Sequence, residues 1–139
     1  MRQIISRNLR LGNAGDLRDP RGILAAGIEA VVELADSEPS ATLPRELIRC
    51  RFPLSDGGDN APWLLRLAAQ TVAALLRAKT PTLICCASGM SRSVCIAAAG
   101  IALAEAKSLD DALAEVARAG PADVAPGLFQ QVGEALTDN

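Results

Sequence analysis

The sequence contains no histidine and no tyrosine, and its aromatic side chains are one tryptophan and two phenylalanines among 139 residues. Without histidine, the chain has no Ser-His or Cys-His nucleophile pair, no histidine metal ligand and no histidine acid or base. Its chemistry must use cysteine, aspartate, glutamate, lysine, arginine or backbone amides. With so few aromatics, Ala, Leu, Val and Ile must fill the core, which favours helices packed on a sheet.

The sequence also has little net charge and no long apolar run. The net charge is only −2, from 14 basic and 16 acidic residues. No basic stripe with interleaved aromatics is present, so we expect no nucleic-acid partner. Arginines interrupt the N-terminal segment, which argues against a signal peptide, and the longest apolar run, residues 94–104, is too short to span a bilayer. We therefore expect a cytoplasmic protein with no membrane association.

The four cysteines, at positions 50, 85, 86 and 95, lack the paired spacing of a zinc ribbon. In the cytoplasm they are expected to be reduced. We predict no metal and no cofactor.

Half of the residues are hydrophobic, which predicts a folded chain, and we interpret residues 1–139 as a single domain. Apolar runs predict an opening strand or hairpin that ends at residues 12–13, and strands at 28–34, 47–52 and 82–85. Helices are predicted at 16–26 with Asp16 as cap, at about 62–78, from 92 or 93 onward, after Ser108, and at about 126–136. The predicted fold class is α/β, with a central, mostly parallel sheet of about four to five strands flanked by helices.

In such sheets ligands bind beyond the carboxyl ends of the strands, so the loop after 82–85 is the candidate site. Residues 84–93 read ICCASGMSRS. Backbone N–H groups and the start of a helix suit a phosphate-sized anion, and Gly89 permits a close approach. Arg92 offers a planar fork to two oxygens. Cys86, at the mouth of this loop, would be a thiolate nucleophile that needs no histidine base.

The arrangement of Cys86, five residues, Arg92 and Ser93 resembles the signature loop of the cysteine-dependent tyrosine and dual-specificity phosphatases. Gly89 and the ending Ser91-Arg92-Ser93 look most like the dual-specificity branch. The resemblance extends from about residue 4 to residue 136, and residues 52–56 (FPLSD) look like the acid loop of that family. It implies a dual-specificity phosphatase-like fold and a metal-independent phosphomonoester hydrolase.

The resemblance also implies roles for individual residues. Cys86 forms a cysteinyl-phosphate, Ser93 helps its sulfur to leave, and Asp56 is the general acid and then the base. The phosphate oxygens are held by Arg92 and by the loop amides. The implied phosphate-binding residues are Ala87, Ser88, Gly89, Met90, Ser91 and Arg92.

Several residues have a second interpretation. The family usually has histidine before the nucleophile, and this chain has Cys85, which leaves open a catalytically weak or inactive phosphate-binding domain. Asp59 competes with Asp56 for the acid role, and Ser93 is also expected to cap its helix. Cys50 is expected to pack in the core, with a protective disulfide to Cys86 as the alternative. Because Cys85 ends a strand, it is expected to point away from Cys86.

A rhodanese-like sulfurtransferase is the alternative from another reaction class, although it gives Asp56 and Ser93 no required role. The uncharged loop residues argue for a phosphorylated protein or a small neutral phosphomonoester as substrate. The absence of tyrosine suggests a shallow site that also accepts phosphoserine and phosphothreonine. We expect a monomer.

Overall fold

The computed structural model describes residues 1–4, 7–35 and 43–137, and within them the strands form one five-stranded sheet. The strands are β1 (Arg2–Gln3), β2 (Leu9–Gly12), β3 (Ala30–Ala35), β4 (Ile48–Leu54) and β5 (Thr82–Cys85). Their order is β1-β2-β5-β3-β4, with β1 antiparallel to β2 and the other pairs parallel. This confirms the predicted α/β class with a mostly parallel sheet.

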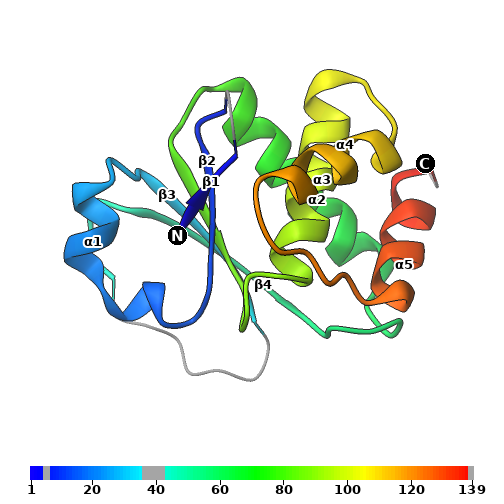
Figure 1. Ribbon diagram of the computed structural model, residues 1–139, viewed down its shortest axis with the longest axis horizontal. Helices are drawn as coiled ribbons and strands as arrows, with labels where there is room; N and C mark the ends of the chain where they lie inside the picture. Colours follow the sequence, from blue (N-terminus) through cyan, green and yellow to red (C-terminus); the bar gives the residue numbers. More distant parts are fainter. Residues whose placement is uncertain (5–6, 36–42, 138–139) are drawn as a thin grey trace.

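Helices cover both faces of the sheet. They are α1 (Pro20–Ala25), α2 (Pro62–Arg77), α3 (Arg92–Glu105), α4 (Leu109–Arg118) and α5 (Pro126–Thr137). Figure 1 shows α1 on one side of the sheet and the other four helices gathered on the opposite side. The larger core lies between the sheet and those four helices, and a smaller one lies on the side of α1. α3 is buried along most of its length, because its apolar residues face the sheet on one side and other helices elsewhere.

The segment after β2 differs from the prediction of one helix capped by Asp16. A 3-10 turn, Asp16–Arg18, comes first, and α1 follows it with Asp19 as its N-cap. The Asp19 carboxylate accepts a hydrogen bond from the N–H of Gly22 at 3.1 Å. The proline that follows Asp19 fits the first position of α1, where no N–H is needed. Asp16 instead accepts from the N–H of Asn13, so it belongs to the preceding turn.

The four parallel strands, β2, β5, β3 and β4, end at one edge of the sheet, at Gly12, Cys85, Ala35 and Leu54. Residues 86–91 and 55–61 leave from this edge, and α3 begins there. Part of the loop after β3, predicted at 36–44, lies outside the described residues. The two loops that contain the predicted site residues therefore lie at the same edge of the sheet, as expected for this type of sheet.

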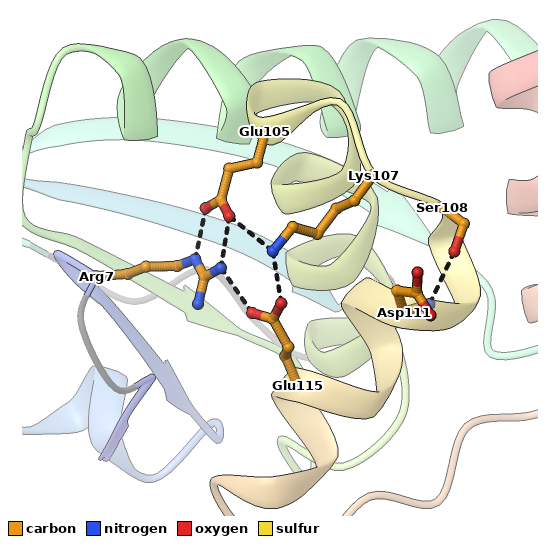
Figure 2. Close-up of polar contacts among 6 residues, drawn as sticks. All are labelled: Arg7, Glu105, Lys107, Ser108, Asp111 and Glu115. Atoms are coloured by element: carbon orange, nitrogen blue, oxygen red, sulfur yellow. Dashed lines mark hydrogen bonds and ion pairs between the residues drawn. The ribbon is translucent and has the colours of Figure 1, made fainter.

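The other end of α3 carries a network of charged side chains (Figure 2). Arg7 donates two hydrogen bonds to Glu105, both at 2.7 Å, and a third to Glu115 at 2.6 Å. Lys107 contacts the same two carboxylates. The hydrogen bond from Arg7 is the main reason that the pKa of Glu105 falls to about 2, and bonds from Lys107 and Arg7 lower the pKa of Glu115. The network joins the turn after β1 to α3 and α4.

The next helix starts as predicted. Ser108 caps α4, accepting from the N–H of Asp111 at 3.1 Å. In the ranges that the structure describes, no helix has the length and apolar character needed to cross a membrane.

Candidate active site

The loop that follows β5, residues 86–92, is called the phosphate loop below. It wraps around the sulfur of Cys86, whose side chain is 2 % exposed. The Sγ atom accepts hydrogen bonds from the backbone N–H groups of Gly89 at 3.2 Å and Ser93 at 3.3 Å. Two amide dipoles therefore point at the sulfur, an arrangement that stabilises negative charge there.

Gly89 is required by the shape of this loop. Its φ of +75° lies in the left-handed region, and a Cβ placed on it would be 2.8 Å from the carbonyl oxygen of Gly12. The carbonyl of Gly89 accepts from Nη2 of Arg2 at 2.9 Å. Burial lowers the pKa of Arg2, and the negative charge of the Cys86 thiolate opposes that shift. Sequence reasoning missed Arg2, because the contact bridges 87 residues and no local pattern indicates it.

Arg92 is the first residue of α3 and is only 7 % exposed. Its Nη1 donates to the carbonyl oxygen of Leu54 at 2.9 Å. Leu54 ends β4, so the guanidinium connects the phosphate loop with the strand that leads into the loop at 55–60, called the acid loop below. A guanidinium held by a backbone carbonyl loses little conformational freedom when it binds a second partner.

Asp56 lies in the acid loop and reaches the phosphate loop. Its Oδ1 accepts a short hydrogen bond from the hydroxyl of Ser91, which in turn accepts from the N–H of Ala125 at 3.0 Å. Within the acid loop, the side chain of Asn60 bonds both to the N–H and to the carbonyl of Ser55, each at 2.8 Å. Both candidate acids are exposed, but Asp56 is the one bonded to the phosphate loop.

The serines at the start of α3 differ from expectation. The N-cap residue is Ser91 and not Ser93, because Ser93 already lies within the first turn. The Ser93 side chain is fully buried, and among the described residues its hydroxyl has no hydrogen-bond partner. Its backbone N–H points at the Cys86 sulfur, so Ser93 faces the nucleophile through its main chain.

The other loop serine, Ser88, accepts from the N–H of Met90 at 3.3 Å. The amide of Met90, which sequence reasoning placed among the phosphate-binding groups, is therefore bonded within the loop. Ala87, Ser88 and Met90 are exposed, whereas Gly89 and Ser91 are buried.

Cys85 and Cys86 pack in different cores. Cys85 belongs to the smaller cluster, on the side of α1, whereas Cys86 belongs to the larger one. Burial, supported by nearby negative charges, raises the pKa of the Cys85 thiol. Burial also raises the pKa of Cys95, on α3, to about 12. Both residues therefore remain neutral thiols near neutral pH.

All four cysteines are free thiols. Cys50 pairs with Val32, and Val32 with Ile84, so Cys50 is two strands away from β5. Two strand spacings alone separate the backbones by roughly 10 Å. A disulfide spans Cα atoms at most about 7 Å apart. The alternative of a direct Cys50–Cys86 disulfide therefore does not fit this fold, and Cys50 packs against the larger core.

The fold and the loop together define an α/β domain with a buried cysteine and a nearly buried arginine at the carboxyl edge of the sheet. The sequence matches no protein-family model and no curated protein. It is similar in structure to human DUSP28, with a TM-score of 0.84, 25 % identity, and coverage of 99 % of this chain and 98 % of that one. A mouse putative dual-specificity phosphatase, crystallised with zinc tungstate, gives a TM-score of 0.80 and 25 % identity over 92 % of this chain and 81 % of that one.

The human tyrosine phosphatase-like serine/threonine/tyrosine-interacting protein shares the fold, with a TM-score of 0.80 and 16 % identity over 99 % of this chain and 95 % of that one. In fold, the chain resembles the dual-specificity phosphatase-like branch of the cysteine-dependent protein tyrosine phosphatases.

Proposed function

We propose that this chain is a phosphomonoester hydrolase that works through a cysteinyl-phosphate intermediate and acts as a protein tyrosine or dual-specificity phosphatase. The observation that carries the proposal is the pair of backbone N–H groups aimed at the Cys86 sulfur, within a loop that ends at a nearly buried Arg92. A sulfur held in this way is suited to be a thiolate without a histidine base.

In the first step the Cys86 thiolate attacks phosphorus, the S–P bond forms, and the ester P–O bond breaks. Asp56 gives its proton to the departing oxygen, which leaves as an alcohol or phenol. Negative charge builds on the three equatorial oxygens as this happens. The guanidinium of Arg92 and the loop amides hold these oxygens, and fixed donors of this kind usually provide the largest catalytic contribution.

In the second step a water molecule attacks the phosphorus of the intermediate. Asp56, now a carboxylate, takes a proton from the water, and the S–P bond breaks to release inorganic phosphate. Ser93 supports the departing sulfur. Its buried hydroxyl, with no partner among the described residues, is available to donate to Sγ, and its N–H already does.

The substrate is proposed to be a phosphorylated protein or a small phosphomonoester. The exposed loop residues Ala87, Ser88 and Met90 are uncharged, which favours substrates without extra phosphate groups. We also propose that residues 1–139 act as one catalytic domain, as a monomer in the cytoplasm.

The test is hydrolysis of p-nitrophenyl phosphate in reducing buffer with a chelator. Cys86→Ser should lower kcat by at least about 1,000-fold, as expected when a nucleophile is removed. Asp56→Asn should lower it by roughly 100-fold, the contribution of a general acid. Cys50→Ser, which replaces a cysteine outside the phosphate loop, is the matched control and should retain activity.

Activity that survives Cys86→Ser would overturn the proposed mechanism. A native protein that binds vanadate without hydrolysing the substrate would instead identify a phosphate-binding domain, with Cys85 as the residue to examine. Sulfur transfer from thiosulfate, without phosphatase activity, would indicate the sulfurtransferase alternative.

A further inference from the structure

Ser91 is the N-cap residue of α3, yet its hydroxyl makes no capping hydrogen bond to that fully described helix. A serine at an N-cap normally accepts from the second or third N–H of its helix. In this chain the N–H of Ser93, the second residue of α3, donates to the Cys86 sulfur instead. The helix start is thus directed at the nucleophile, and the Ser91 side chain is available for another task.

The direction of the Ser91 hydroxyl proton is set by its two partners. A hydroxyl has one proton to donate and two lone pairs to accept with. The N–H of Ala125 can only donate, so at 3.0 Å it occupies a lone pair of Oγ. The proton is then left for Oδ1 of Asp56, which lies within hydrogen-bond distance. Ser91 is only 5 % exposed, so water competes little for these bonds.

Asp56 needs such a contact because its own loop fixes it poorly. The residue is exposed, and Gly57 and Gly58, which follow it, restrict the backbone less than other residues. Asn60 closes the base of the acid loop through Ser55, and its own backbone exchanges two hydrogen bonds with the side chain of Gln131 on α5. These bonds hold the loop at its ends, whereas Ser91 holds the carboxylate itself.

We propose that Ser91 is a positioning residue, whose hydroxyl, oriented by the Ala125 amide, holds the Asp56 carboxyl beside the phosphate loop for proton transfer. This inference rests on the proposed function. The bond occupies Oδ1, so Oδ2 is the oxygen that gives its proton to the leaving group and later takes one from water. Ala125 immediately precedes α5, so the segment that leads into this helix contributes to the site.

The kinetic test compares Ser91→Ala with Thr71→Ala, which removes a hydroxyl that is hydrogen-bonded within α2. Phenyl phosphate has a poor leaving group that needs the acid, and p-nitrophenyl phosphate needs it less. For Ser91→Ala, kcat with phenyl phosphate should fall about 10-fold, a fraction of a full general-acid contribution, with little change in KM. With p-nitrophenyl phosphate the fall should be smaller, and Thr71→Ala should match the native chain. In an Asp56→Asn background, Ser91→Ala should have no further effect.

A second readout does not depend on activity. Amide hydrogen exchange in residues 55–60 should be faster in Ser91→Ala than in the native chain or in Thr71→Ala, because the acid loop loses its link to the phosphate loop. A native protein without Cys86-dependent hydrolysis would overturn the proposed function, and exchange would then still decide the role of Ser91. Unchanged exchange, or equal losses of kcat on both substrates, would overturn the role proposed for Ser91.

Discussion

The two ends of α3 are held in place by different kinds of contact. At its start, Arg92 is nearly buried and donates to the carbonyl of Leu54, 38 residues away in sequence. At its end, Glu105 is 36 % exposed and pairs with the side chain of Arg7, 98 residues away. At the first end, a backbone carbonyl away from solvent holds Arg92 and fixes its geometry. The second uses charged side chains near solvent, where each pair contributes little.

This difference predicts that the two ends of α3 contribute differently to catalysis and to stability. A change at the start of α3 should alter catalysis more than stability, because the same groups hold the candidate nucleophile and its oxyanion site. A change at the end should alter stability slightly and leave catalysis intact. Three substitutions, taken from the largest expected effect to the smallest, test this comparison.

Arg92→Lys should have the largest effect. Lysine keeps the charge but lacks the planar fork that holds two phosphate oxygens while also reaching Leu54. We expect kcat/KM for p-nitrophenyl phosphate to fall by about 100-fold or more, as for loss of an oxyanion donor. Vanadate affinity should fall with it, and the urea midpoint should change little. If the lysine variant kept native kcat/KM, the start of α3 would not be the catalytic end.

The start of α3 was located correctly by sequence reasoning, although its N-cap residue was not. Cys86, Gly89 and Arg92 lie within one loop of seven residues, so their spacing in the sequence indicates that they lie close together. The strand before and the helix after follow from local apolar patterns, and both were confirmed at residues 82–85 and 92–105. Local patterns therefore sufficed to predict the position of this loop and of its flanking strand and helix.

Contacts between distant residues could not be predicted in this way. Ser91 reaches Asp56 across 35 residues and Ala125 across 34. The second contact forms only when α5, which follows Ala125, packs against α2 and α3. The first helix was wrong for a local reason, because Asp16 and Asp19 are both good caps and the proline after Asp19 decides between them. No sequence pattern indicated the network at Glu105, because its residues come from separate segments.

Cys85→His, which introduces the usual residue of the family, should have an intermediate effect. Cys85 packs in the smaller core, and a Cβ on Gly12 would be only 3.2 Å from its sulfur, so the space is filled. A larger polar ring there should lower the free energy of unfolding by about 1–3 kcal/mol, measured by urea titration. Cys85→Ser, close to the native size, is the control for volume. A stability at or above that of the native chain would show that the site has room for the ring.

Glu105→Gln should have the smallest effect and should act on stability alone. The pKa of Glu105 is lowered from 4.5 to about 2 in the folded chain, so its contribution is present above about pH 4.5 and is lost as the pH falls toward 2. The side chain is more than one third exposed, so solvent screening limits this contribution to less than about 1 kcal/mol at neutral pH. The difference in unfolding free energy between native and variant should shrink as the pH falls through this window, and also in 1 M salt.

The matched control for this variant is Glu134→Gln, which neutralises an exposed carboxylate on α5 that accepts from Gln130. Both variants should hydrolyse p-nitrophenyl phosphate at the native rate at pH 7. A lower rate in Glu105→Gln alone would mean that the charged end of α3 influences the phosphate loop through the helix. The separation of function and stability along α3 would then fail, and the network of Arg7, Glu105, Lys107 and Glu115 would be part of the catalytic apparatus.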